Sequence, residues 1–180
     1  MGNEARSTAG AGADAVARAA GTGPSTRAEA AAVAAGLDHV VTRHGPVSSL
    51  AEAAAARGLE PEQVVKTIVV RLGEDDHRFV LVPGGREIAW PRLRALLGVN
   101  RLSLPPAEEA REVTGYERGS ITPLGSLRAL PVVADERVRG TVSIGGGAPG
   151  VALTVAAEDL LTLLDAVVAD VTRPQQEGAS

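Results

Sequence analysis

Short blocks of hydrophobic residues, separated by polar turns, run along most of the chain and predict short strands and helices. Blocks rich in Val, Ile and Leu predict strands at residues 37–42, 64–72, 78–82, 101–104, 130–134, 141–144, 151–155 and 167–171. Capping residues, helical spacing and glycine stops predict helices at residues 26–35, 50–57, 92–97, 107–113 and 157–166. The polar turn at residues 73–77 predicts a hairpin, which we expect at the centre of the sheet. Because these elements alternate irregularly, the sequence predicts an α+β fold in which helices pack round a mixed sheet.

The ends of the chain differ from its middle. Residues 1–24 are rich in small residues without periodicity, so we predict a disordered tail. Residues 25–173 are expected to form one domain, and residues 174–180 a polar tail. The start lacks the basic and apolar segments of a signal peptide, and no apolar run has the length of a membrane span. We therefore expect a cytoplasmic protein.

Composition excludes several classes of site. Aromatic residues make up 2% of the chain and the formal charge is −4, which disfavours base stacking and a broad phosphate-binding surface. Cysteine is absent and the three histidines are scattered, so no metal site is expected. Residues 145–150 match the GxGxxG pattern, but a strand pattern follows where a dinucleotide site requires a helix. The sequence therefore predicts neither a metal nor a cofactor.

Lys66 is the most informative single residue, because it is the sole lysine among 18 basic residues. It lies in the strand predicted at residues 64–72, on the same face as Val64 and Ile68. One interpretation is a desolvated ammonium that binds a carbonyl, a phosphate or an attacking water. The other is a side chain that extends from an edge strand into water.

Two glycine-rich loops and one carboxylate complete the candidate chemistry. Residues 114–125 hold three glycines and a proline, and such a loop lets backbone amides approach a ligand, although an ordinary surface loop has the same composition. Residues 145–150 are interpreted as a hairpin connection that lines the same pocket. Asp135 follows a predicted strand, where it could orient Lys66 or a ligand amine, or cap the following turn.

From about Leu37 to Arg173 the chain resembles the YbaK/prolyl-tRNA-synthetase-associated domain family of aminoacyl-tRNA deacylases. The order of the motifs carries the resemblance. These are the lysine strand at residues 61–67, the substrate loop at 114–125, the strand ending in aspartate at 130–135, and the C-terminal hairpin and helix at 146–150 and 157–160.

The resemblance implies a mixed, strongly curved β-sheet surrounded by helices. It also implies an enzyme that removes a small amino acid, such as Ala, Ser or Cys, from mischarged tRNA, commonly tRNA(Pro), without a metal, a cofactor or a covalent protein nucleophile. The partners would be the aminoacyl-tRNA acceptor end and a synthetase such as prolyl-tRNA synthetase. By carry-over Lys66 would be the essential polar residue. The substrate-binding residues would be Gly119, Ser120, Ile121, Thr122, Pro123, Asp135, Gly146 and Gly147.

One departure from the family pattern keeps other functions open. Ala148 and Pro149 stand where the family often has a basic pair. A second hypothesis is therefore a non-catalytic module that binds a tRNA end, a synthetase or a small ligand. A third is Schiff-base chemistry at Lys66, for which the sequence positions no proton shuttle.

Overall fold

The computed structural model describes residues 24–176. The tail predicted at residues 1–24 lies outside this range except for Pro24, at which helix α2 (Pro24–Ala34) begins. Of the polar tail predicted at residues 174–180, residues 177–180 also lie outside it. Over the described range, no helix combines the length and the apolar character needed to cross a bilayer.

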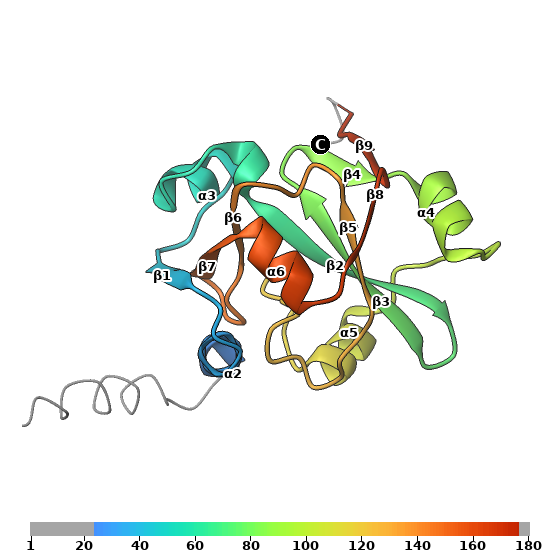
Figure 1. Ribbon diagram of the computed structural model, residues 1–180, viewed down its shortest axis with the longest axis horizontal. Helices are drawn as coiled ribbons and strands as arrows, with labels where there is room; N and C mark the ends of the chain where they lie inside the picture. The colour runs from blue at the N-terminus through green and yellow to red at the C-terminus, as the bar shows by residue number, and fades with distance from the viewer. Residues whose placement is uncertain (1–23, 177–180) are drawn as a thin grey trace, which may run out of the picture.

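Two larger sheets and one small one form the frame of the fold (Figure 1). The first sheet is antiparallel, in the order β1 (His39–Arg43), β7 (Val151–Ala156) and β6 (Thr141–Gly145). The second sheet is mixed, in the order β2 (Val65–Gly73), β3 (Asp76–Pro83), β5 (Val132–Asp135) and β8 (Val167–Ala169). The small sheet pairs β4 (Arg86–Ile88) with β9 (Thr172–Pro174). The mixed α+β fold is thus confirmed, whereas strong curvature of the sheet stays a prediction.

Besides α2, the helical segments are α3 (Leu50–Ala56), the single turn η1 (Pro61–Gln63), α4 (Trp90–Leu97), α5 (Ala107–Thr114) and α6 (Ala157–Leu163). All five predicted helices form, although α2 and α4 begin two residues earlier than predicted and α6 ends three residues earlier. The Ser49 side chain accepts a hydrogen bond from the Glu52 N–H at 3.1 Å and so caps α3. Gly98 and Gly115 adopt the left-handed conformation that ends α4 and α5.

Strands β2 and β3 contribute to hydrophobic clusters on both faces of the four-stranded sheet. Val69, Phe79 and Leu81 pack with residues of α2, α5 and α6 in one hydrophobic cluster. Val70 and Val80 alternate with them and pack in a second cluster with residues of α4 and β4 and with Val171. Burial on both faces explains why β2 and β3 have nearly continuous hydrophobic sequences.

Two sequence predictions about strands are wrong, and two short strands, β4 and β9, were not predicted. The β2–β3 hairpin does not form the centre of the sheet, because β2 is an edge strand and β3 lies inside it. Residues 101–104 do not form a strand; only Ser103 makes a bridge, to Arg71. Strand β4 was missed because its three residues pair only with β9, far along the chain, and carry no periodic pattern of their own.

Candidate functional site

A pocket of about 410 Å³ lies along the edge of β2 that faces away from β3. Among residues 24–176, this edge is paired only at its ends, where Val64 bridges to Ser143 and where Arg71 and Ser103 exchange two backbone hydrogen bonds of 2.8 and 3.1 Å. We call the cavity between these two ends the edge pocket. It is lined by residues 64–69, by Leu104 and Pro105, by Arg118, Gly119 and Ile121 of the glycine-rich loop, and by Arg57, Ala110 and Gly145.

Strand geometry directs backbone polar groups of β2 into the edge pocket. The Phe79 N–H donates to the Pro131 carbonyl on the β5 side, so the next residue, Val80, points its polar groups toward β2. Val80 lies opposite Ile68, so the polar backbone groups of Ile68 point toward β3. Because this direction alternates along the strand, the N–H and C=O of Thr67 point away from β3, toward the open edge. The Thr67 hydroxyl is also buried without a hydrogen-bond partner. The wall formed by β2 thus offers polar groups to a bound ligand.

Lys66 lies at this wall, but it is exposed rather than desolvated. Of the two interpretations of Lys66, the structure of the free protein shows the side chain that extends from an edge strand into water. The alternation rule identified the face of the strand correctly, but it could not show that the strand lies at a sheet edge, where that face opens to solvent. Among the salt bridges between residues 24 and 176, none involves Lys66, so its charge is available to a ligand.

Two arginines join Lys66 around the edge pocket. Burial lowers the pKa of the half-buried Arg57 guanidinium, whose Nη1 donates to Ser143 Oγ at 3.2 Å and whose Nε is buried without a partner. Arg118 donates from Nη2 to the Pro105 carbonyl at 3.0 Å. Of the described residues that line the pocket, three are cationic and none is acidic. The pocket is therefore suited to an anionic ligand.

The glycine-rich loop also lines the pocket, but it places only part of the predicted set of substrate-binding residues there. Gly119, with a φ of +93°, and Ile121 line the pocket. The Ser120 N–H donates to the Glu117 carbonyl at 2.9 Å, so that amide is already engaged in a turn. Ser120, Thr122 and Pro123 are not among the lining residues.

A clamp from helix α2 holds this loop. Arg27 donates to the carbonyls of Gly115 and Gly125, both at 3.2 Å, and its guanidinium lies 4.7 Å from the centre of the Tyr116 ring. The Tyr116 hydroxyl in turn donates to the Leu124 carbonyl at 2.7 Å. Burial raises the pKa of the Tyr116 phenol, and the charge of Arg27 partly offsets this. Both ends of the loop are thus hydrogen-bonded to the Arg27 guanidinium.

We expect Arg27→Met to loosen the loop at residues 115–125 and to lower the free energy of unfolding by about 2 kcal/mol, because two charged hydrogen bonds are lost. Urea denaturation measures the free energy, and amide hydrogen exchange measures protection of the loop. Arg27→Lys is the control that keeps the charge without the planar fork, and it should rescue only part of both quantities. Unchanged exchange in the loop of the Met variant would show that the clamp does not position it.

The second glycine-rich loop contributes Gly145 to the edge pocket rather than Gly146 or Gly147. A Cβ at Gly145 would lie 3.0 Å from the Ile121 carbonyl oxygen, so a small residue is needed where the two loops meet. The Gly146 N–H donates to the Val151 carbonyl at 2.8 Å within the connection between β6 and β7. The interpretation of residues 145–150 as a hairpin connection is confirmed.

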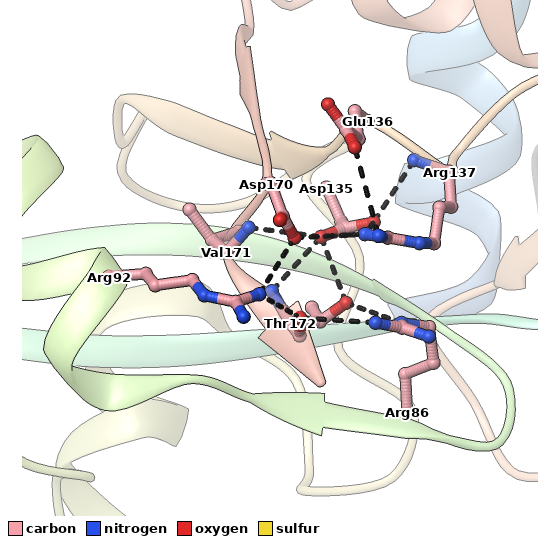
Figure 2. A network of polar contacts seen from close by, with 8 residues as sticks. All are labelled: Arg86, Arg92, Asp135, Glu136, Arg137, Asp170, Val171 and Thr172. Carbon is pink, nitrogen blue, oxygen red and sulfur yellow. Dashed lines mark hydrogen bonds and ion pairs between the residues drawn. The ribbon is translucent and has the colours of Figure 1, made fainter. Parts of the chain in front are cut away.

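Asp135 lies in a polar network at the end of β5 (Figure 2). It is not among the residues that line the edge pocket. It is fully buried and accepts hydrogen bonds from the backbone of Val171, the backbone and hydroxyl of Thr172, and the backbone and side chain of Arg137. Burial alone would raise the pKa of Asp135, but these hydrogen bonds outweigh it and lower the pKa. Its oxygens are therefore occupied by the protein itself, which fits the turn-capping interpretation better than contact with Lys66 or a ligand.

Sequence reasoning missed the two arginines of the edge pocket. Arg118 had a usable signal, because it is a cation directly before Gly119 in the loop already singled out. Arg57 had none, because it reaches the site from the end of α3 through a contact with Ser143, 86 residues away. Only the fold brings these segments together.

Comparison with known proteins identifies the family. The sequence profile of the aminoacyl-tRNA editing domain matches residues 44–163. A proline–tRNA ligase of Bacillus licheniformis is 32% identical over 108 residues, which are 58% of this chain but only 18% of the ligase. The proposed Cys-tRNA(Pro)/Cys-tRNA(Cys) deacylase EbsC of Enterococcus faecalis is 24% identical over 131 residues, 72% of this chain and 78% of that protein.

Solved structures agree with the sequence match. The crystal structure of a proposed trans-editing enzyme for prolyl-tRNA synthetase has a TM-score of 0.77 to this chain at 30% identity, and the match covers 86% of this chain and 99% of that one. The family profile covers more than half of the residues, and the fold is shared over nearly the whole of that structure. This chain therefore belongs to the aminoacyl-tRNA editing domain family.

Proposed function

We propose that this chain hydrolyses the ester bond between a small amino acid and a wrongly charged tRNA, with Ala, Ser or Cys on tRNA(Pro) as the candidate substrates. The observation that carries the proposal is that Lys66 of β2 and Gly119 of the glycine-rich loop line one pocket, together with Arg57 and Arg118 and without any acidic lining residue. An aminoacyl-tRNA end brings phosphates and an ester carbonyl to the same place, and this set of groups complements both.

The proposed chemistry needs a stabilised oxyanion and an oriented water. Attack of water on the ester carbonyl builds negative charge on the carbonyl oxygen, and the tetrahedral intermediate then releases the ribose hydroxyl of the tRNA and the free amino acid. The Lys66 ammonium and the Gly119 amide are the donors that we assign to this oxygen or to the adjoining phosphate. The reaction as proposed uses no metal, no cofactor and no covalent bond to the protein.

Pocket size supports a small aminoacyl group. A volume of about 410 Å³ lies at the lower end of the roughly 300–1,000 Å³ typical of small-molecule sites. Val65, Leu104, Pro105 and Ile121 give the lining an apolar part against which a short side chain can pack. A second site that selects small side chains is useful because one missing methylene changes the binding free energy in a synthetase pocket by only about 1–3 kcal/mol.

The relatives support action beside a synthetase. The domain is a small part of the matched proline–tRNA ligases, whereas EbsC and the solved trans-editing structure are matched over most of their length. We therefore propose that this chain acts in trans on tRNA that a synthetase such as prolyl-tRNA synthetase has mischarged.

A deacylation panel tests the proposal. Purified protein is incubated with tRNA(Pro) carrying Ala, Ser, Cys, Thr or Pro, and the loss of the ester is followed against the spontaneous rate in buffer. We expect rapid loss of one or two of the small amino acids and no effect on Pro, because the cognate product must survive. If no species is cleared above the spontaneous rate, the hydrolase proposal is wrong for this panel, and tRNA binding without hydrolysis would then favour a non-catalytic module.

A further inference from the structure

A second cationic pocket, of about 370 Å³, lies further along the same strand. We call it the arginine pocket, because Arg71 at the end of β2, Arg94 in the last turn of α4 and Arg101 all line it, with Asn100 and Ser103 as neutral polar neighbours. The edge pocket is lined by residues 64–69 and 104–105, and the arginine pocket by residues 71–73 and 100–103. The same two segments of chain therefore pass from one pocket directly to the other.

The charges of the arginine pocket are largely uncompensated. Within residues 24–176, neither Arg94 nor Arg101 takes part in a salt bridge or donates a side-chain hydrogen bond. Arg71 pairs with Glu109 at 3.4 Å, and Glu109 also contacts His77 at 2.7 Å. Of the three guanidinium groups, that of Arg71 alone has a carboxylate partner among the described residues, which leaves an excess of positive charge at the pocket.

The acidic turn between β2 and β3 does not cancel this excess. Asp76 pairs with Arg78, and Asp75 lies 4.0 Å from Arg128, so both carboxylates have cationic partners of their own. Glu74 is exposed and is not among the residues that line the pocket. The Arg94 and Arg101 side chains remain free to bind an anion.

Spacing relates the second pocket to the first. Lys66 and Arg71 are five residues apart on one strand, a separation of about 17 Å at roughly 3.3 Å per residue. A stacked nucleic-acid strand advances about 3.4 Å per nucleotide, so the same distance corresponds to about five nucleotides. We propose that the arginine pocket binds a backbone phosphate of the tRNA acceptor strand, about five nucleotides from the aminoacylated end held in the edge pocket. The placement of that end rests on the proposed function.

Such a contact would have a defined role. Phosphate contacts fix the register of a nucleic acid without reading its sequence. The arginine pocket would thus hold the acceptor strand so that the ester reaches Lys66, and it would favour a full tRNA over a free aminoacyl nucleoside. A chain with a net charge of −4 can achieve this because six of its 18 basic residues line these two neighbouring pockets.

Binding of uncharged tRNA(Pro) as a function of salt tests this proposal without relying on hydrolysis. The Arg94→Ala/Arg101→Ala double variant is compared with wild type, and Arg139→Ala serves as control, since Arg139 is an exposed arginine outside both pockets. Each lost phosphate contact reduces the slope of log K against log salt concentration by about 0.7–0.9. We expect a slope smaller by at least about 0.7 and weaker tRNA binding in the double variant, with wild-type behaviour in the control.

A short ligand distinguishes binding at the edge pocket from binding at the arginine pocket. Binding of the trinucleotide CCA, which is too short to span both, should be the same in the double variant and in wild type. The proposal is wrong if wild type binds no tRNA, if the slope is unchanged, or if tRNA and CCA lose affinity equally. If the double variant shows the expected slope while wild type clears no mischarged tRNA in the panel, the hydrolase proposal fails and the phosphate site stands.

Discussion

Lys66→Ala should lower kcat/KM for the cleared aminoacyl-tRNA by at least about 100-fold, the loss typical of removing one donor from a developing oxyanion. The free energy of unfolding should change by no more than about 0.5 kcal/mol, because Lys66 is exposed and has no salt bridge among the described residues. Single-turnover deacylation measures the first quantity and urea denaturation the second. A large loss of activity at constant stability would place the ammonium in the reaction itself.

Lys66→Arg is the sharper variant, because it keeps the positive charge. A guanidinium is planar and larger than an ammonium, so it should restore little of the lost activity if a compact point charge must reach the substrate. Arg139→Ala is the matched control for removal of an exposed cation elsewhere. If Lys66→Arg is as active as wild type, a general electrostatic role is sufficient, and if Lys66→Ala is also fully active, Lys66 takes no part in catalysis.

The exposure of Lys66 in the free protein is compatible with this role. Its strand edge is open along the pocket, and a ligand that fills the pocket would displace water from the ammonium. Electrostatic interactions strengthen when water is excluded, so the ammonium would act most strongly once substrate is bound. An exposed lysine on an edge strand was one of the two interpretations that the sequence allowed, and the structure shows that it does not remove Lys66 from the candidate site.

Local signals in the sequence predicted much of the fold. The cap at Ser49 and the glycines that end α4 and α5 depend on the nearest few residues, and each is confirmed. The alternation of β2 also gave the right grouping of its side chains, with Val69 and Val70 on opposite faces. These features are predictable because their physical cause lies within one or two turns of the chain.

Features that depend on distant segments were not predictable in the same way. The position of β2 at the edge depends on which strands pair, and strand pairing is a property of the whole sheet. Arg57 enters the pocket through Ser143, and Arg27 reaches Gly125 across 98 residues. Arg27 also precedes the matched family region at residues 44–163, so the clamp on the glycine-rich loop comes from a part of the chain that the family profile does not cover.

Asp135→Asn should lower the free energy of unfolding by about 3–5 kcal/mol at neutral pH, the usual cost of breaking a buried ion pair from one side. The reason is geometric: the carboxylate accepts from Val171, Thr172 and Arg137, and an amide nitrogen in its place would face N–H and O–H donors. Asp170→Asn is the matched control, because Asp170 pairs with Arg137 and Arg92 from an exposed position and should cost less than about 1 kcal/mol. Equal losses in the two variants would contradict a special role for the buried carboxylate.

The pH dependence of this loss identifies its origin. The pKa of Asp135 is lower in the folded than in the unfolded state. Its contribution to the free energy of unfolding is therefore fully present above the unfolded-state pKa of about 3.9, and it is lost as the pH falls through the folded-state pKa. Urea denaturation from pH 7 down to about pH 3 should therefore show the wild type and Asp135→Asn converging in acid. Deacylation by the folded variant at low temperature should retain the wild-type KM, because Asp135 does not line the edge pocket. A raised KM at unchanged stability would instead place Asp135 in contact with substrate, as the family resemblance first implied.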